Sequence, residues 1–194
     1  MITPSAAGPA RVAQSGVVTD TIVDFYAGTA TDQRGRSLRE IQQWSDDRLE
    51  AAHDYIQWLF PLPEPSPVNP LAPVLRETTI ETFATRAELR ENLRASLDRM
   101  LRFYGLELRN GPPPDVIASG NFAARASNWL RAGNHNHLRI TRILKCCALL
   151  GLGAEARAFL ERLEEIYLGE QRKPHTGITG ESMRYWRSAI KAPG

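Results

Sequence analysis

A leucine repeat in the middle of the chain constrains the fold more than any other feature. Within residues 85–104, apolar residues recur at steps of four and three: Leu89, Leu93, Leu97, Leu101 and Tyr104. Arginine and glutamate occupy many of the positions between them, so one face is apolar and the other charged. This spacing matches the period of about 3.6 residues of an α-helix. Gly105 stands where a helix C-cap is expected. The repeat therefore predicts a long amphipathic helix.

Amphipathic segments elsewhere predict further helices. They run from Asp20 to Ala27, from Ser37 to Trp44, over 46–60, over 121–131, from Leu138 to Leu150, from Phe159 to Tyr167 and over 179–191. Ser37 and Ser45 have the side chain of a helix N-cap, and Glu40 stands three residues after Ser37 as in a capping box. No strand-like alternation is identified. We expect an all-α fold, a compact single-domain array of about seven helices.

The segment from His53 to Pro61 reads HDYIQWLFP and is apolar nearly all round a helix. Such a segment is typical of a central, buried helix. We expect the helix that Ser45 opens to continue through it and to end near Pro61, because proline interrupts helical hydrogen bonding. Six prolines then predict a stiff connector rather than a helix or a central strand. They are Pro61, Pro63, Pro65, Pro67, Pro70 and Pro73.

Length and composition favour one globular domain in a reducing compartment. The chain has 194 residues, of which 42% are hydrophobic and 24% charged, as in ordinary globular proteins. We expect a flexible leader over 1–18 and a helical domain over 19–191. No apolar run suits a signal peptide or a transmembrane segment. The two cysteines, Cys146 and Cys147, are neighbours and are poorly placed to bridge each other. These features predict a cytoplasmic protein without a disulfide framework.

Charge is distributed unevenly along the chain. The formal net charge of +2 is too small to favour nucleic acid as a partner. Residues 37–64 nevertheless hold six acidic and two basic residues, whereas residues 116–154 hold five basic residues and no acidic one. Two interpretations follow. The segments face each other in the fold or form solvated faces, or the basic segment receives an anion, an acidic peptide or nucleic acid.

Seven residues in these two segments are candidate ligand-binding residues: His53, Asp54, Gln57, Trp58, His135, Arg139 and Arg142. The first four either satisfy one another inside the core or line a pocket, because buried polar groups need partners. Arg139 and Arg142 are three residues apart on one helical face, a spacing that suits a carboxylate or a phosphate. The alternative is that they pair with the acidic segment.

No motif of high specificity for catalysis, for a metal or for a cofactor is found. A metal site made of histidines is not favoured, because His135 and His137 splay apart on a helix. An enzyme would have to use a cluster of His53, His135 and Arg139, with a histidine as acid or base acting on a small anionic substrate. We therefore predict neither a cofactor nor a metal, and favour a binding protein over an enzyme.

Two long motifs carry a resemblance to a known family. HDYIQWLFPL at 53–62 and HNHLRITRILK at 135–145 resemble the conserved region of the opioid growth factor receptor family, and MLRFYGLEL and SMRYW fit the same order. Vertebrate members are described as nucleus-associated receptors for the peptide Met-enkephalin. The resemblance implies a helical binding module whose ligand is a peptide or a small anionic molecule. No nuclear address is present here, and the Ala- and Arg-rich composition is typical of a short microbial member.

Overall fold

Helices dominate the computed structural model, which describes residues 20–170 and 177–191. In these residues the helices are α1 (Thr21–Tyr26), α2 (Leu38–Gln42), α3 (Asp46–Ala51), α4 (Ile56–Leu59), α5 (Glu77–Thr85), α6 (Ala87–Tyr104), α7 (Phe122–Trp129), α8 (Asn136–Leu149), α9 (Gly153–Glu170) and α10 (Gly180–Ala189). The strands are β1 (Leu106–Arg109) and β2 (Asp115–Ala118). The mainly helical prediction is confirmed, but the described part has ten helices rather than about seven. The predicted leader over 1–18 lies outside the described residues.

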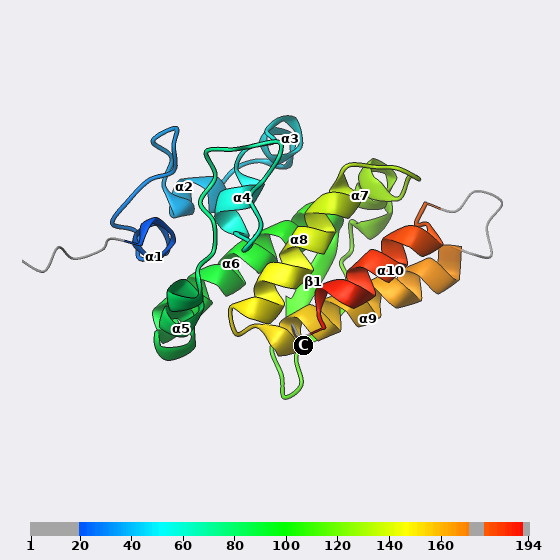
Figure 1. Ribbon diagram of the computed structural model, residues 1–194. Helices are drawn as coiled ribbons and strands as arrows, with labels where there is room; N and C mark the ends of the chain where they lie inside the picture. The colour runs from blue at the N-terminus through cyan, green and yellow to red at the C-terminus, as the bar shows by residue number, and fades with distance from the viewer. Residues whose placement is uncertain (1–19, 171–176, 192–194) are drawn as a thin grey trace, which may run out of the picture.

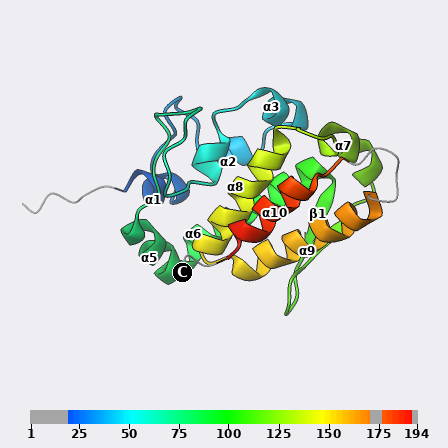
Figure 2. The same cartoon turned by 45° about the vertical axis from the view of Figure 1, so that its right-hand side comes forward.

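The long helix α6 joins the two halves of the molecule. Short helices α1 to α5 gather at one end, whereas α7 to α10 and the sheet form the other (Figure 1). The rotated view shows the same division (Figure 2). Helix α6 contacts α1, α2 and α5 in the first half and α7, α8 and β1 in the second. Its leucines Leu89, Leu93, Leu97 and Leu101 are fully buried, so the helix predicted from the leucine repeat is confirmed.

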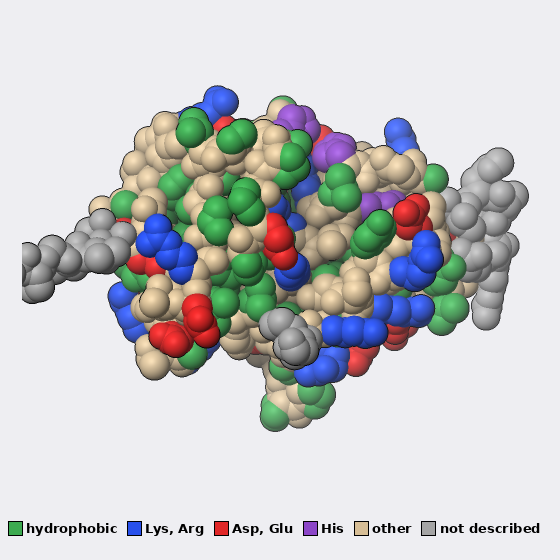
Figure 3. Space-filling view, in the orientation of Figure 1, with side chains coloured by type: hydrophobic (Ala, Val, Ile, Leu, Met, Phe, Trp, Pro, Cys, Tyr) green, Lys and Arg blue, Asp and Glu red, His purple; other side chains and the backbone are tan. Residues whose placement is uncertain are grey.

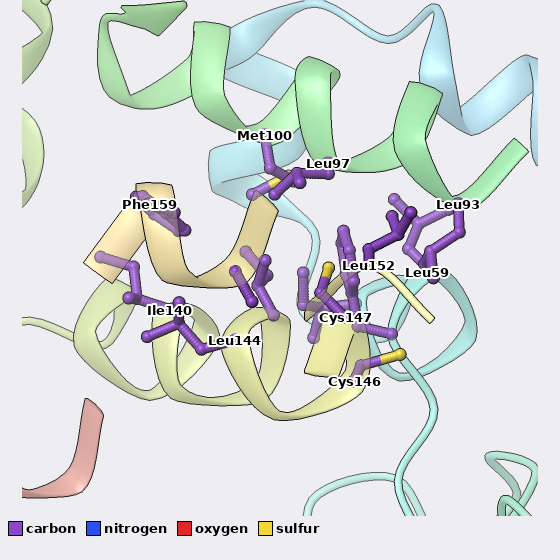
Figure 4. Close-up of a cluster of buried hydrophobic side chains, with 14 of the residues drawn as sticks. Leu59, Leu93, Leu97, Met100, Ile140, Leu144, Cys146, Cys147, Leu152 and Phe159 are labelled. Carbon is purple, nitrogen blue, oxygen red and sulfur yellow. The ribbon is translucent and has the colours of Figure 1, made fainter. Parts of the chain in front are cut away.

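The core lies between α6, α8 and α9. Leu93, Leu97 and Met100 of α6 face side chains of α8, with Phe159 of α9 and Leu59 of α4 beside them (Figure 4). Cys146 and Cys147 belong to this cluster, and both are free and buried. Burial raises the pKa of both thiols, so they remain protonated and pack as small apolar groups.

Three predicted caps are present in the structure. Ser37 Oγ accepts a hydrogen bond from Glu40 N at 3.2 Å, and Ser45 Oγ accepts one from Arg48 N at 3.3 Å. Gly105 ends α6 with a φ of +79°, in the left-handed region that glycine adopts without strain. The Glu40 carboxylate pairs with Arg48 at 3.2 Å. Ser37 and Ser45 thus begin α2 and α3 where the sequence predicts.

The prediction of one helix over 46–60 is wrong. Helix α3 ends at Ala51, and Ala52 is extended with a ψ of 140°. Residues 52–55 form an irregular link, and α4 is a single short helix over Ile56–Leu59. The segment HDYIQWLFP is still buried from Tyr55 to Phe60. It contributes to the core as a link and a short helix rather than as a central helix.

The prediction of an all-α fold without strands is also wrong, because β1 and β2 form an antiparallel hairpin. Leu106 pairs with Ala118 and Arg109 with Asp115. Leu106 and Val116 are fully buried, and the side chains of Glu107 and Arg109 are exposed. The alternating pattern of LELR and the turn residues of NGPPP were the signals for this hairpin. Each strand has only four residues, so the pattern is short.

Candidate functional site

Helix α8 carries the basic candidates, and Arg139 is the most enclosed of them. Its side chain is 5% exposed. Arg139 Nη2 donates to the carbonyl oxygens of Ala52 at 2.8 Å and Glu50 at 3.5 Å, and lies 3.1 Å from His53 Nδ1. Arg139 Nη1 lies 3.5 Å from the Glu50 carboxylate and donates to Asn136 Oδ1 at 3.1 Å. The guanidinium therefore caps the last turn of α3 and explains why the helix ends there.

The next two cations of α8 contact the segment that follows. Arg142 Nη1 donates to the carbonyl of Phe60 at 3.1 Å, at the end of α4. Burial lowers the pKa of Arg142, although the nearby Glu64 opposes this shift. Lys145 Nζ donates to Glu64 in the proline-rich connector, and this bond holds the pKa of Glu64 below its usual value. Successive cations of α8 thus fix α3, α4 and the connector in order.

These contacts explain the uneven charge along the sequence. Arg139 pairs with Glu50 and Lys145 with Glu64. Arg125 of α7 also lies 3.3 Å from the Asp46 carboxylate. The interpretation that the acidic and basic segments face each other is therefore confirmed.

Two exposed histidines gather beside Arg139. The rings of His53 and His135 stand edge to face with centroids 5.5 Å apart. His135 Nε2 lies 3.3 Å from Glu50 Oε1. Burial lowers the pKa of His135, and Arg139 and His53 lower it further against the opposing effect of Glu50. The structure thus brings together His53, His135 and Arg139. Among residues 20–170 and 177–191, no group of three His, Cys, Asp or Glu side chains is arranged to hold a metal ion.

The remaining candidates lie apart from the histidines. The Asp54 carboxylate pairs with Arg34 at 2.5 Å and Arg36 at 3.0 Å. Trp58 is 4% exposed, and its indole Nε1 donates to Gln33 Oε1 at 2.5 Å. Gln57 is 3% exposed, and its Oε1 has no hydrogen-bond partner in the described part of the chain. The seven candidates therefore do not line one common pocket.

His137 has a structural role that was not predicted from the sequence. Its Nε2 lies 3.0 Å from the carbonyl of Trp129 and its Nδ1 lies 3.1 Å from Ser182 Oγ. A carbonyl only accepts, so Nε2 carries the proton and Nδ1 accepts from the serine hydroxyl. The His137 carbonyl accepts from Trp186 Nε1 at 3.1 Å. His137 therefore joins α7, α8 and α10.

Protonation of His137 and His135 should weaken the fold. Burial lowers the pKa of both below the ordinary value, so the unfolded chain takes up protons first as the pH falls. The contribution of the two neutral histidines to the free energy of unfolding should be fully present above about pH 6.5 and decrease as the pH falls below it. Urea unfolding at about pH 7.5 and about pH 5.5 should show a decrease in the free energy of unfolding. The variant His137→Gln should show a smaller decrease, and an unchanged pH slope would contradict this assignment.

A groove lies beside the arginine contacts, between α8, α10 and the connector. Its volume is about 960 Å³, and its walls include Glu64, Thr141, Lys145, Tyr185 and Ile190. A smaller hollow of about 360 Å³ lies at the N-terminal ends of α8 and α10, where His135, His137 and Glu181 line it. Thr141 and Tyr185 line both, so the two hollows adjoin along α8.

The face that carries this groove is partly apolar. Leu138 of α8 is 75% exposed and Tyr185 of α10 is 56% exposed. Figure 3 shows apolar side chains spread over this face, histidines toward its upper edge, and lysine and arginine gathered at the lower right over α9 and α10. The groove could not be predicted from the sequence, because its walls come from elements far apart in the chain.

The fold and the groove define a class: a mainly helical domain with a groove between two helices. A sequence profile of the opioid growth factor receptor (OGFr) conserved region matches residues 19–194. The opioid growth factor receptor of Mus musculus is 46% identical over 134 residues, which cover 67% of this chain and 21% of that protein. The chain belongs to the opioid growth factor receptor conserved-region family.

Other relatives agree with this assignment. The opioid growth factor receptor of Homo sapiens is 37% identical over 155 residues, covering 78% of this chain and 22% of that protein. The opioid growth factor receptor-like protein 1 of Mus musculus is 39% identical over 119 residues, covering 57% of this chain and 24% of that protein. The chain therefore spans less than a quarter of the length of these relatives. No solved structure matches it.

Proposed function

We propose that this chain is a non-catalytic binding module that takes a short, extended peptide in the groove between α8 and α10. The observation that carries this proposal is the groove of about 960 Å³, which adjoins the hollow beside His135. Its size lies within the range of about 300–1,000 Å³ of ligand sites. Its walls combine apolar residues with charged ones such as Glu64, Arg157 and Lys191, and this mixed lining suits a peptide better than a small anion. The relatives' names, receptors of an opioid growth factor, support the same class of ligand.

The predicted site residues have unequal parts in this proposal. His135 lines the smaller hollow that adjoins the groove, and His53 and Arg139 lie next to His135. Asp54, Trp58 and Arg142 support the proposal indirectly, because their contacts with Arg36, Gln33 and Phe60 hold the neighbouring segments in place.

An enzyme is the weaker alternative. Both terminal nitrogens of Arg139 contact protein atoms, so this guanidinium is not available to hold a substrate anion. Asp54 pairs with Arg34 and Arg36 instead of orienting a histidine. We therefore favour binding over catalysis.

The chain is also proposed to be cytoplasmic. Its two buried cysteines are free, as is common in a reducing compartment. Within residues 20–170 and 177–191, no helix has the length and apolarity needed to span a bilayer.

Blocking the groove should abolish peptide binding. Thr141 lines both hollows and is half-buried, so Thr141→Arg places a long cation at their junction. Isothermal titration with Met-enkephalin should show binding to the parent chain and a Kd at least about tenfold weaker for Thr141→Arg. Thr82→Arg is the matched control. Thr82 is also half-buried and also bonds the carbonyl four residues earlier, but it lies on α5. An equal loss of affinity in both variants, or no binding of Met-enkephalin to the parent chain, would refute the proposed site.

A further inference from the structure

The groove has a direction, because its two ends carry opposite charge. His137 contacts Ser182 near the beginning of α8 and α10. Ala148, near the end of α8, and Ile190, just after α10, both line the groove. The helices therefore run parallel, and the groove follows them. Glu181 lines the smaller hollow, which adjoins the groove at the beginning of α8 and α10, whereas Arg157 and Lys191 line the groove at the other end of these helices.

The two cations at the end are available to a ligand. Lys145 is engaged by Glu64. Arg157 and Lys191 are both exposed, and neither has an ion-pair partner among residues 20–170 and 177–191. Figure 3 shows basic side chains along the lower right of the molecule, over α9 and α10. An arginine and a lysine beside one hollow can hold a carboxylate by charge-assisted hydrogen bonds.

The wall beside these cations is apolar. Ala148 and Leu149 of α8 and Ile190 after α10 line the groove there and are partly buried. An apolar side chain of a ligand would cover them while an adjacent carboxylate reached Arg157 and Lys191. Glu181 is exposed at the opposite end. Its carboxylate would face the positively charged N-terminus of the ligand. This distribution complements a peptide with free termini.

The length of the groove matches a short peptide. Glu181 and Lys191 are separated by ten positions along α10 and its end, which corresponds to about 15 Å at about 1.5 Å per helical residue. An extended peptide advances about 3.3 Å per residue, so about five residues bridge the two ends.

We propose that the groove selects short peptides by their free C-terminal carboxylate, bound by Arg157 and Lys191, with an apolar last residue against Ile190 and the N-terminus toward Glu181. This inference rests on the proposed peptide-binding function. It makes Arg157 and Lys191 determinants of specificity that the linear sequence does not reveal, since Arg157 belongs to α9 and Lys191 follows α10.

The test uses two random pentapeptide libraries, one with free C-terminal carboxylates and one amidated, selected on the full chain and read by mass spectrometry. Free-acid peptides with apolar last residues should be retained. Their resynthesised amides should bind at least about tenfold more weakly. The double variant Arg157→Gln/Lys191→Gln should lose this difference. Arg109→Gln, an exposed change on β1 outside the groove, should keep it.

The possible outcomes separate carboxylate selection from peptide binding itself. Equal affinity for acids and amides would overturn carboxylate selection while leaving the peptide groove in place. Retention of neither library by the parent chain would overturn both proposals. Thermal unfolding of the double variant near the parent's temperature shows that a lost preference comes from the groove and not from misfolding.

Discussion

Replacing Trp129 with alanine is expected to lower the free energy of unfolding by about 3–5 kcal/mol. Trp129 is fully buried at the end of α7 and packs edge to face against Tyr104, with ring centroids 5.5 Å apart. Its indole Nε1 donates to the carbonyl of Tyr104 at 3.0 Å. The substitution removes the ring, leaves a cavity and leaves that carbonyl without its donor. Urea unfolding monitored by circular dichroism measures the loss.

A second variant separates the ring from its hydrogen bond. Trp129→Phe keeps most of the packing but removes the indole N–H, so it should cost about 1–3 kcal/mol. A loss below about 1 kcal/mol for the alanine variant would show that α7 is not packed as described.

Replacing Arg139 with methionine should cost about 3 kcal/mol, although methionine fills much of the same space. The change removes the donor to the carbonyl of Ala52 at 2.8 Å and leaves the end of α3 uncapped. It also removes the cation beside the Glu50 carboxylate. The measurement is again urea unfolding, and the variant should unfold at a lower midpoint.

Arg131→Met is the control for this substitution. Arg131 is exposed after α7, and the same exchange there should change stability by no more than about 0.5 kcal/mol. Equal effects at the two positions would contradict the capping role of Arg139.

The sequence pattern predicted the position and the end of α6 correctly, because its leucine repeat is long and a glycine follows it. The break between α3 and α4 could not be predicted in this way. It is stabilised by Arg139, which lies 89 residues after Glu50 in the chain, and a local window of sequence does not contain such a contact. The hairpin could not be predicted for a different reason: the alternation of buried and exposed residues extends over only four residues in each strand.

The candidate site was predicted only in part. Two kinds of partner were predicted for Arg139 and Arg142, a bound anion or the acidic segment. Arg139 pairs with the Glu50 carboxylate of that segment, and the two arginines also donate to the carbonyls of Ala52 and Phe60. The proximity of His53 and His135 was anticipated as a condition of the enzyme hypothesis and is present. The groove depends on the packing of α10 against α8, and nothing in either helix alone indicates it.

The most direct test of a peptide groove between α8 and α10 is an NMR titration of the ¹⁵N-labelled chain with Met-enkephalin. The proposed function predicts that the largest amide shift changes follow the groove, at Thr141, Lys145, Tyr185 and Ile190, and spare α5. Shift changes concentrated on α5, or no shift changes at saturating peptide, would contradict it.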